Sequence, residues 1–167
     1  LDDGRELELD VLVYCTGFRV DQPLGELRLE GLGGRDLGET WGARPRALLG
    51  ITVPGFPNAF LLLGPNTALG HNSVVVMIEA QIKYVLQAIA AATSLGERAW
   101  IDASQAHLDA FLAWVDGRHQ GQVWASGCQS WYLSTEGTNF TIWPGSTVSY
   151  IAKTRRFDLR QYTVGGR

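Results

Sequence analysis

The pattern of apolar and polar residues along the chain predicts alternating strands and helices. From residue 6 to residue 14, apolar residues first alternate with polar ones and then occupy both odd and even positions. This is typical of a strand that enters a sheet covered on both faces. A second apolar run, residues 59–63, predicts a short buried strand. From residue 74 to about residue 92, apolar residues cover most of a helical circumference, and Glu79, Lys83 and Gln87 form one expected solvated stripe.

A second helix is predicted between Asp102 and Gly117. Asp102 and Gln105 have the spacing of a capping box, and four apolar residues follow at the spacing of a buried helix face. Glycine is frequent just beyond the last helical residue, so we expect the helix to end at Gly117. We interpret this helix as part of the packing rather than of the chemistry.

The segments around these elements are predicted to be less regular. Residues 25–57 indicate a β-hairpin followed by a loop, and their glycines do not form a G-x-G-x-x-G loop because Asp36 occupies its third glycine position. From residue 120 onward, aromatic residues and glycines replace helical periodicity. That segment either walls an apolar pocket or forms a tightly packed surface coil. Arg155, Arg156 and Arg160 are expected on a solvated face or a docking patch.

Glycine-containing turns follow both predicted strands. Ligands of α/β proteins bind beyond the carboxyl ends of strands, and glycine lets a ligand approach the backbone closely. The alternative is that each turn only ends its strand. The candidate contacts are Thr16, Gly17 and Phe18 after the first strand and Gly64, Pro65 and Asn66 after the second.

The start of the long helix completes this candidate site. His71, Asn72 and Ser73 immediately precede it and are all candidate N-terminal caps. A helix N-terminus presents unpaired N–H groups and a partial positive charge, which suits an anionic ligand group. The alternatives are an ordinary crossover without a ligand, and a His71 that only caps the helix or hydrogen-bonds within the loop.

Composition narrows the class of protein. The chain has 167 residues, 46% of them hydrophobic and 19% charged, which is typical of one globular domain. Its net charge of −3 provides no basic surface for nucleic acid or anionic lipid, and no uninterrupted apolar run reaches the roughly 18 residues of a membrane span. Cys15 and Cys128 lack the spacing of a metal site, and we expect a reducing, cytoplasmic compartment.

The beginning of the sequence indicates a longer polypeptide. Asp3-Gly4 has the composition of a two-residue hairpin turn, and only two residues precede that turn. The partner strand would therefore lie upstream. We expect the chain to be a C-terminal fragment without a segment that targets or anchors it.

Several stretches, in order along the chain, resemble motifs of flavin-dependent monooxygenases with two dinucleotide-binding domains, and most closely those of the Baeyer–Villiger monooxygenases. Residues 10–18 are similar to the family pattern D-x-x-x-x-A-T-G-[FWY], with Cys15 in place of the usual alanine. The other matching stretches are residues 55–58 with 64–66, residues 70–73 with Glu79, and residues 127–132 with Asn139, Trp143 and Pro144.

The resemblance implies an α/β fold, the C-terminal portion of a Rossmann-like FAD/NAD(P)-binding domain with an incomplete sheet. It implies that NADPH reduces FAD and that a flavin peroxide formed with O₂ inserts oxygen beside a ketone or oxidises a soft nitrogen or sulfur centre. The small-molecule substrate would meet catalytic residues supplied by the upstream polypeptide. No catalytic residue, nucleic acid or membrane is expected for this chain, which alone would be inactive.

The resemblance also divides the chain and assigns roles to residues. Residues 1–24 would re-enter the FAD domain, 25–57 form the hairpin and loop, 58–118 the flavin-facing unit and second helix, and 119–167 the aromatic segment. The turn at 64–66 would pass the ribityl chain of the flavin, and amides near Asn72 and Ser73 would face its pyrimidine ring. Trp131 and Tyr132 would lie on the substrate side.

Two other functions stay open from the sequence. A flavin-dependent disulfide reductase has a related fold, but Cys15 and Cys128 would have to meet in space. A non-catalytic module would instead bind its ligand on the aromatic C-terminal segment.

Overall fold

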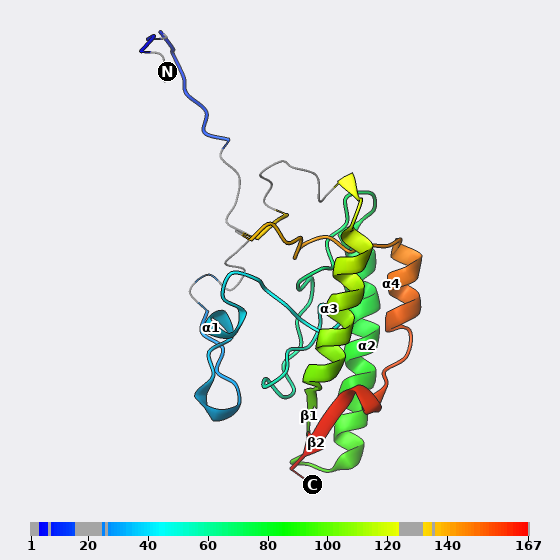
Figure 1. Ribbon diagram of the computed structural model, residues 1–167. Helices are drawn as coiled ribbons and strands as arrows, with labels where there is room; N and C mark the ends of the chain where they lie inside the picture. The colour runs from blue at the N-terminus through cyan, green and yellow to red at the C-terminus, as the bar shows by residue number, and fades with distance from the viewer. Residues whose placement is uncertain are drawn as a thin grey trace.

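The computed structural model describes residues 4–6, 8–15, 25, 27–123, 132–134 and 136–166. Its long helices pack side by side, and a small sheet lies at one end of them (Figure 1). The elements, in order, are η1 (Leu32–Gly34), α1 (Leu37–Trp41), α2 (Val74–Leu95), β1 (Trp100–Ala103), α3 (Gln105–His119), α4 (Thr147–Thr154), η3 (Leu159–Gln161) and β2 (Tyr162–Gly165). Strands β1 and β2 pair antiparallel, with Trp100 opposite Gly165 and Ala103 opposite Tyr162.

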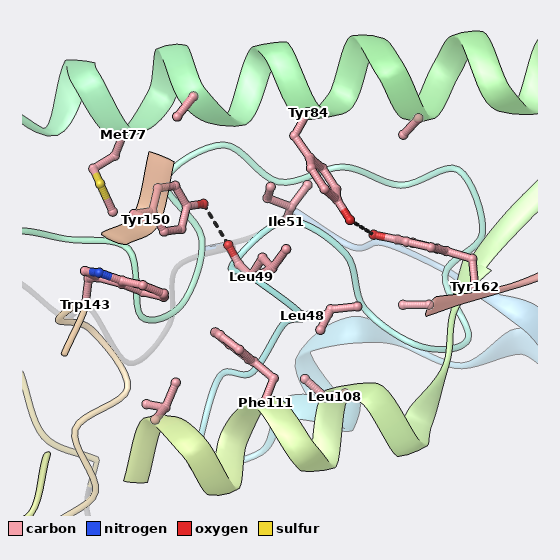
Figure 2. Close-up of a cluster of buried hydrophobic side chains, with 14 of the residues drawn as sticks. Leu48, Leu49, Ile51, Met77, Tyr84, Leu108, Phe111, Trp143, Tyr150 and Tyr162 are labelled. Atoms are coloured by element: carbon pink, nitrogen blue, oxygen red, sulfur yellow. Dashed lines mark hydrogen bonds between the residues drawn. The ribbon is translucent and has the colours of Figure 1, made fainter. Parts of the chain in front are cut away.

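The main core lies between α2 and α3 and is filled by a loop. Leu48, Leu49 and Ile51 enter from that loop, between Tyr84 of α2 and Phe111 of α3 (Figure 2). Two hydrogen bonds satisfy polar atoms inside this apolar cluster. The Tyr150 hydroxyl donates to the Leu49 carbonyl over 2.8 Å, and the Tyr84 and Tyr162 hydroxyl groups lie 3.1 Å apart. The loop is therefore fixed by both packing and hydrogen bonds.

The long helix is present as predicted, but only part of the expected solvated stripe is exposed. Ser73 caps α2 by accepting a hydrogen bond from the Val75 amide, and Gly96 follows the last turn with φ 137°. Glu79 and Lys83 are exposed, whereas Gln87 is half-buried. The Gln87 side chain accepts from the Phe157 amide and donates to the Arg155 carbonyl, so it joins α2 to the chain after α4.

The second helix has different ends from those predicted. Asp102 belongs to β1, and both of its carboxylate oxygens accept from the Gly55 amide at 2.9 Å, so it forms no capping box. Ser104 is the N-cap residue of α3. The helix continues through Gly117 to His119, because the buried His119 side chain packs the last turn against Ile142.

Neither predicted strand is present in the described residues. Residues 8–15 are all exposed and lie away from the helices (Figure 1), and residues 59–63 form no β-bridge with any described residue. A strand needs a neighbouring strand to satisfy its backbone groups. Apolar alternation indicates a strand without supplying that neighbour, so neither segment is paired within the described part of this chain.

The predicted hairpin is reduced to a single turn. Glu30 and Asp36 form an isolated antiparallel bridge around η1. The second arm is α1 instead of a strand, because Asp36 accepts a hydrogen bond from the Glu39 amide and caps that helix. Asp3, half of the predicted first hairpin turn, lies outside the described residues.

One helix among the described residues is long and apolar enough to cross a membrane by length and composition alone. This is α2, and 28% of its most apolar 18-residue window is buried inside the molecule. It contains no uninterrupted apolar run of that length, because Glu79 and Lys83 lie within it. Core helices of proteins outside membranes meet the same criterion.

Candidate functional site

The turn after residue 63 lies beside the segment that precedes α4. The Asn66 amide donates to the Phe140 carbonyl over 2.7 Å, and the Trp143 amide donates to the Ala68 carbonyl over 2.9 Å. A parallel bridge between Ala68 and Ile142 lies between these two bonds. Residues 66–68 and 139–143, far apart in sequence, therefore form one unit.

The side chain of Asn66 is used to hold this unit together. Asn66 is 1% exposed and has a positive φ of 58°, and its Nδ2 donates to the Asn139 carbonyl over 2.9 Å. Asn139 in turn accepts from the Thr141 and Ile142 amides with its Oδ1. Any ligand at this turn would meet the backbone rather than the Asn66 side chain.

Gly64 is required by the chain itself. A Cβ atom there would lie 2.3 Å from the Gly50 carbonyl oxygen, so only glycine allows the two turns to touch. Pro65 is buried beside it, and the Thr67 hydroxyl donates to the Gly64 carbonyl over 2.6 Å. This packing fixes the turn against the loop that contains Gly50.

The N-terminus of α2 is open to solvent. His71, Asn72 and Ser73 are all exposed. Asn72 accepts from the Ser73 amide over 2.7 Å, and its Nδ2 donates to Thr147 at the start of α4. Within the described part of the chain, the Val74 amide has no acceptor, so the positive end of the helix dipole points outward.

A pocket of about 690 Å³ lies between the starts of α2 and α4. His119 supports its wall from inside the protein, because its Nε2–H donates to the Ile142 carbonyl over 3.1 Å. Burial lowers the pKa of His119 below its ordinary value of 6.5, so its ring is neutral at pH 7. The lining residues are His71, Gly121, Gln122, Val123, Ile142, Trp143, Pro144, Gly145 and Ser146.

The chemistry of this site favours binding over catalysis. It offers the start of α2 and the Ser146-capped start of α4, and the neutral His119 lies behind its wall without lining it. Among the residues that the structure describes, no cluster of His, Cys, Asp or Glu could hold a metal ion. Cys15 is an exposed free thiol, and Cys128 lies outside the described residues. No described contact supports a reactive thiol pair.

The structure brings together part of the predicted site. The turn at Gly64, Pro65 and Asn66 and the start of α2 both contact residues 139–147. Tyr132 is half-buried and precedes the bridge between Leu133 and Asn139. Four predicted residues, Thr16, Gly17, Phe18 and Trp131, lie outside the described residues.

Three residues hold the site together without having been assigned that role from the sequence: Gly50 and Thr147, which were not singled out, and Asn139, which was named only as part of a family motif. Asn139 had a local signal, because asparagine commonly accepts from backbone amides two or three residues later. Gly50 and Thr147 gave no such signal, since their partners are distant in sequence.

The chain is similar to curated monooxygenases over nearly all of its length. It is 43% identical over 164 residues to a Baeyer–Villiger monooxygenase of Streptomyces coelicolor and 41% identical over 162 residues to one of Pseudomonas aeruginosa, covering 97% and 96% of this chain. The chain spans only 31% of the length of each relative. No family model matches the chain.

Solved structures show the same fold. A closed structure of cyclohexanone monooxygenase aligns with a TM-score of 0.82 at 24% identity, covering 99% of this chain and 32% of that one. The complex of OTEMO with FAD and NADP aligns with a TM-score of 0.79 at 22% identity, covering 96% of this chain and 30% of that one. The chain is thus homologous, over nearly its whole length, to one segment of the Baeyer–Villiger monooxygenases.

Proposed function

We propose that this chain is the C-terminal part of an FAD-dependent, NADPH-using monooxygenase of the Baeyer–Villiger type. The observation that carries this proposal is the 43% identity over 97% of the chain to a Baeyer–Villiger monooxygenase. The chain supplies binding surface for the cofactor, and the longer polypeptide supplies the catalytic residues. A cytoplasmic location and the division at residues 24, 57 and 118 stay predictions.

The geometry around α2 suits an FAD molecule. The N-terminus of α2 is exposed and keeps the Val74 amide without an acceptor in the described residues, which fits a ring that gains negative charge. Asn72 and Ser73 would hold that ring edge, with His71 beside them. The backbone of Gly64, Pro65 and Asn66 would pass the ribityl chain, and Thr16, Gly17 and Phe18 would complete the contact.

The proposed reaction converts a ketone, O₂, NADPH and a proton into an ester, water and NADP⁺. FAD, when bound, would take two electrons from NADPH and deliver them to O₂. This chain would hold the FAD and exclude water from its pyrimidine edge. Trp131 and Tyr132 would face the substrate, and nitrogen or sulfur compounds would be alternative acceptors of the oxygen atom.

The test is turnover by the longer polypeptide that contains these residues. We expect it to purify with bound FAD, to oxidise NADPH faster when a ketone is added, and to place one ¹⁸O atom from ¹⁸O₂ in the ester. The 167-residue chain alone, given FAD, should show no turnover. A longer polypeptide that binds FAD but leaves every ketone, amine and sulfide tested unchanged would contradict the proposal.

A further inference from the structure

Trp143 belongs to the wall of the pocket between the starts of α2 and α4. It is 2% exposed and lines the pocket together with Ile142 and Pro144, so this part of the wall is apolar. Its Nε1–H donates to Ser149 Oγ over 3.0 Å and to the Ser146 carbonyl over 3.2 Å. Both acceptors lie at the start of α4, which therefore holds the polar edge of the indole ring.

Aromatic rings pack against the rest of Trp143. The ring centroid of Tyr150 lies 4.9 Å away with its edge toward Trp143 (Figure 2), and those of Trp114 and Phe111 lie 5.2 and 6.3 Å away. Aromatic pairs at these distances prefer defined orientations. Tyr150 and Phe111 are buried, whereas Trp114 is half-buried. Trp114 thus connects the pocket wall to the protein surface.

Cations from two helices lie over the ring of Trp114. Lys153 Nζ, in the last turn of α4, is 4.2 Å from the ring centroid, and Arg118 Cζ, in the last turn of α3, is 5.6 Å from it. Both distances are within the range of cation–π attraction. Neither cation forms an ion pair with a described residue, and the neighbouring Asp116 is held by Arg44 over 2.6 Å.

Lys153 is the cation that can fix the indole rings relative to α4. Arg118 and Trp114 both belong to α3, so their contact stays within one helix. Lys153 instead reaches from α4 to the ring on α3, and its charge lies nearer to the ring centroid, where the attraction is stronger. Trp143 is therefore held by Ser149 near the start of α4 and, through Trp114, by Lys153 near its end.

We propose that Lys153 is a positioning residue for the pocket: through Trp114, its charge at the surface fixes the orientation of Trp143 in the pocket wall. Lys153 itself is exposed and does not line the pocket. The inference rests on the proposed function only for the ligand, because an apolar wall would contact the hydrocarbon part of a ketone substrate.

Fluorine NMR tests the proposal without reference to flavin or activity. The longer polypeptide is labelled with 5-fluorotryptophan, and the resonance of Trp143 is assigned by its loss in Trp143→Phe. Lys153→Met removes the charge and keeps an unbranched side chain, whereas Lys153→Arg keeps a charge that can lie over the ring. Lys83→Met, at an exposed position on α2, is the matched control. We expect Lys153→Met to shift or broaden the Trp143 resonance, and the other two variants to leave it unchanged.

Kinetics of the longer polypeptide give a second readout. A displaced wall weakens binding of the ketone in the ground state and the transition state alike. We therefore expect Lys153→Met to raise KM for the ketone about two- to fivefold, as the strength of an exposed cation–π contact implies, with kcat changed less than about twofold. Lys153→Arg should restore the original KM.

Several results would overturn the proposal. An unchanged Trp143 resonance in Lys153→Met would show that the ring is held without this cation. Equal shifts in Lys153→Met and Lys153→Arg would assign the effect to packing rather than charge, and a shift in Lys83→Met would assign it to surface charge in general. A shifted resonance with an unchanged KM would deny the wall a part in binding. A longer polypeptide that turns over no ketone, but whose Trp143 resonance shifts in Lys153→Met alone, would refute the proposed function and support the role of Lys153.

Discussion

At the scale of the residue, two glycines pack backbone against backbone beneath the turn at residues 64–67. A Cβ atom on Gly50 would lie 2.2 Å from Thr67 Cγ2, and one on Gly64 would lie 2.3 Å from the Gly50 carbonyl oxygen. The protein itself therefore demands glycine where the sequence suggested room for a ligand. A glycine in a turn cannot by its presence distinguish close approach of a ligand from close approach of another turn.

Substitution of Gly64 by alanine tests this packing. We expect Gly64→Ala to lower the free energy of unfolding by about 1–3 kcal/mol, because the added methyl group overpacks a backbone contact. Gly117→Ala is the matched control, since a Cβ there meets nothing within 4 Å and the residue lies inside α3. It should raise stability by about 0.5–1 kcal/mol. Urea denaturation measures both, and equal effects would contradict the packing account.

His119 gives the protein a pH dependence of predictable sign. Its pKa in the folded state lies below the ordinary 6.5, so as the pH falls below 6.5 the unfolded state binds the proton first. The free energy of unfolding should therefore decrease from about pH 6.5 downward until the folded-state pKa is reached. His119→Gln should flatten this part of thermal melts recorded between pH 7.5 and pH 5.5, while His107→Gln, at an exposed position, should keep the original slope.

At the scale of the element, local signals predicted helices better than their ends. Apolar periodicity located α2 because the helix buries one complete face, and Ser73 is a strong N-cap residue. Gly117 did not end α3, because tertiary contact of His119 with Ile142 outweighs the weak helix propensity of glycine. Helix ends depend on such tertiary contacts, which cannot be predicted from local sequence because the partners are distant along the chain.

Gln87 shows how a polar residue in a predicted solvated stripe can join elements. Gln87→Ala would leave the Phe157 amide and the Arg155 carbonyl without their partner, so we expect a loss of about 1–2 kcal/mol of stability. Lys83→Ala, one turn earlier and exposed, should change stability by less than about 0.5 kcal/mol. Equal losses in urea denaturation would mean that Gln87 is no link between α2 and the segment after α4.

At the scale of the whole molecule, the sequence predicted the long helices and the start of α2 with the 64–66 turn. It did not predict the observed strands β1 and β2. The apolar segments 8–15 and 59–63 have no strand partner among the described residues, so their pattern alone could not produce a sheet. The start of α2 and the 64–66 turn were predicted from local chemistry. Their union with residues 139–147 depends on contacts between distant segments, which no local pattern reports.

The most direct test of the central claim, that the start of α2 faces a flavin, is the reduction potential of FAD in the longer polypeptide. Ser73→Asp keeps a good N-cap but adds a negative charge at the tip of α2, and Ser104→Asp does the same at α3, whose start lies at the opposite end of the helices (Figure 1). A helix-end charge effect of about 0.3–1 kcal/mol corresponds to roughly 5–20 mV for a two-electron couple.

We predict that Ser73→Asp lowers the two-electron potential of the bound FAD by about that amount, because negative charge disfavours its reduction, and that Ser104→Asp leaves it unchanged. Equal potentials in both variants and the unaltered protein would contradict the claim.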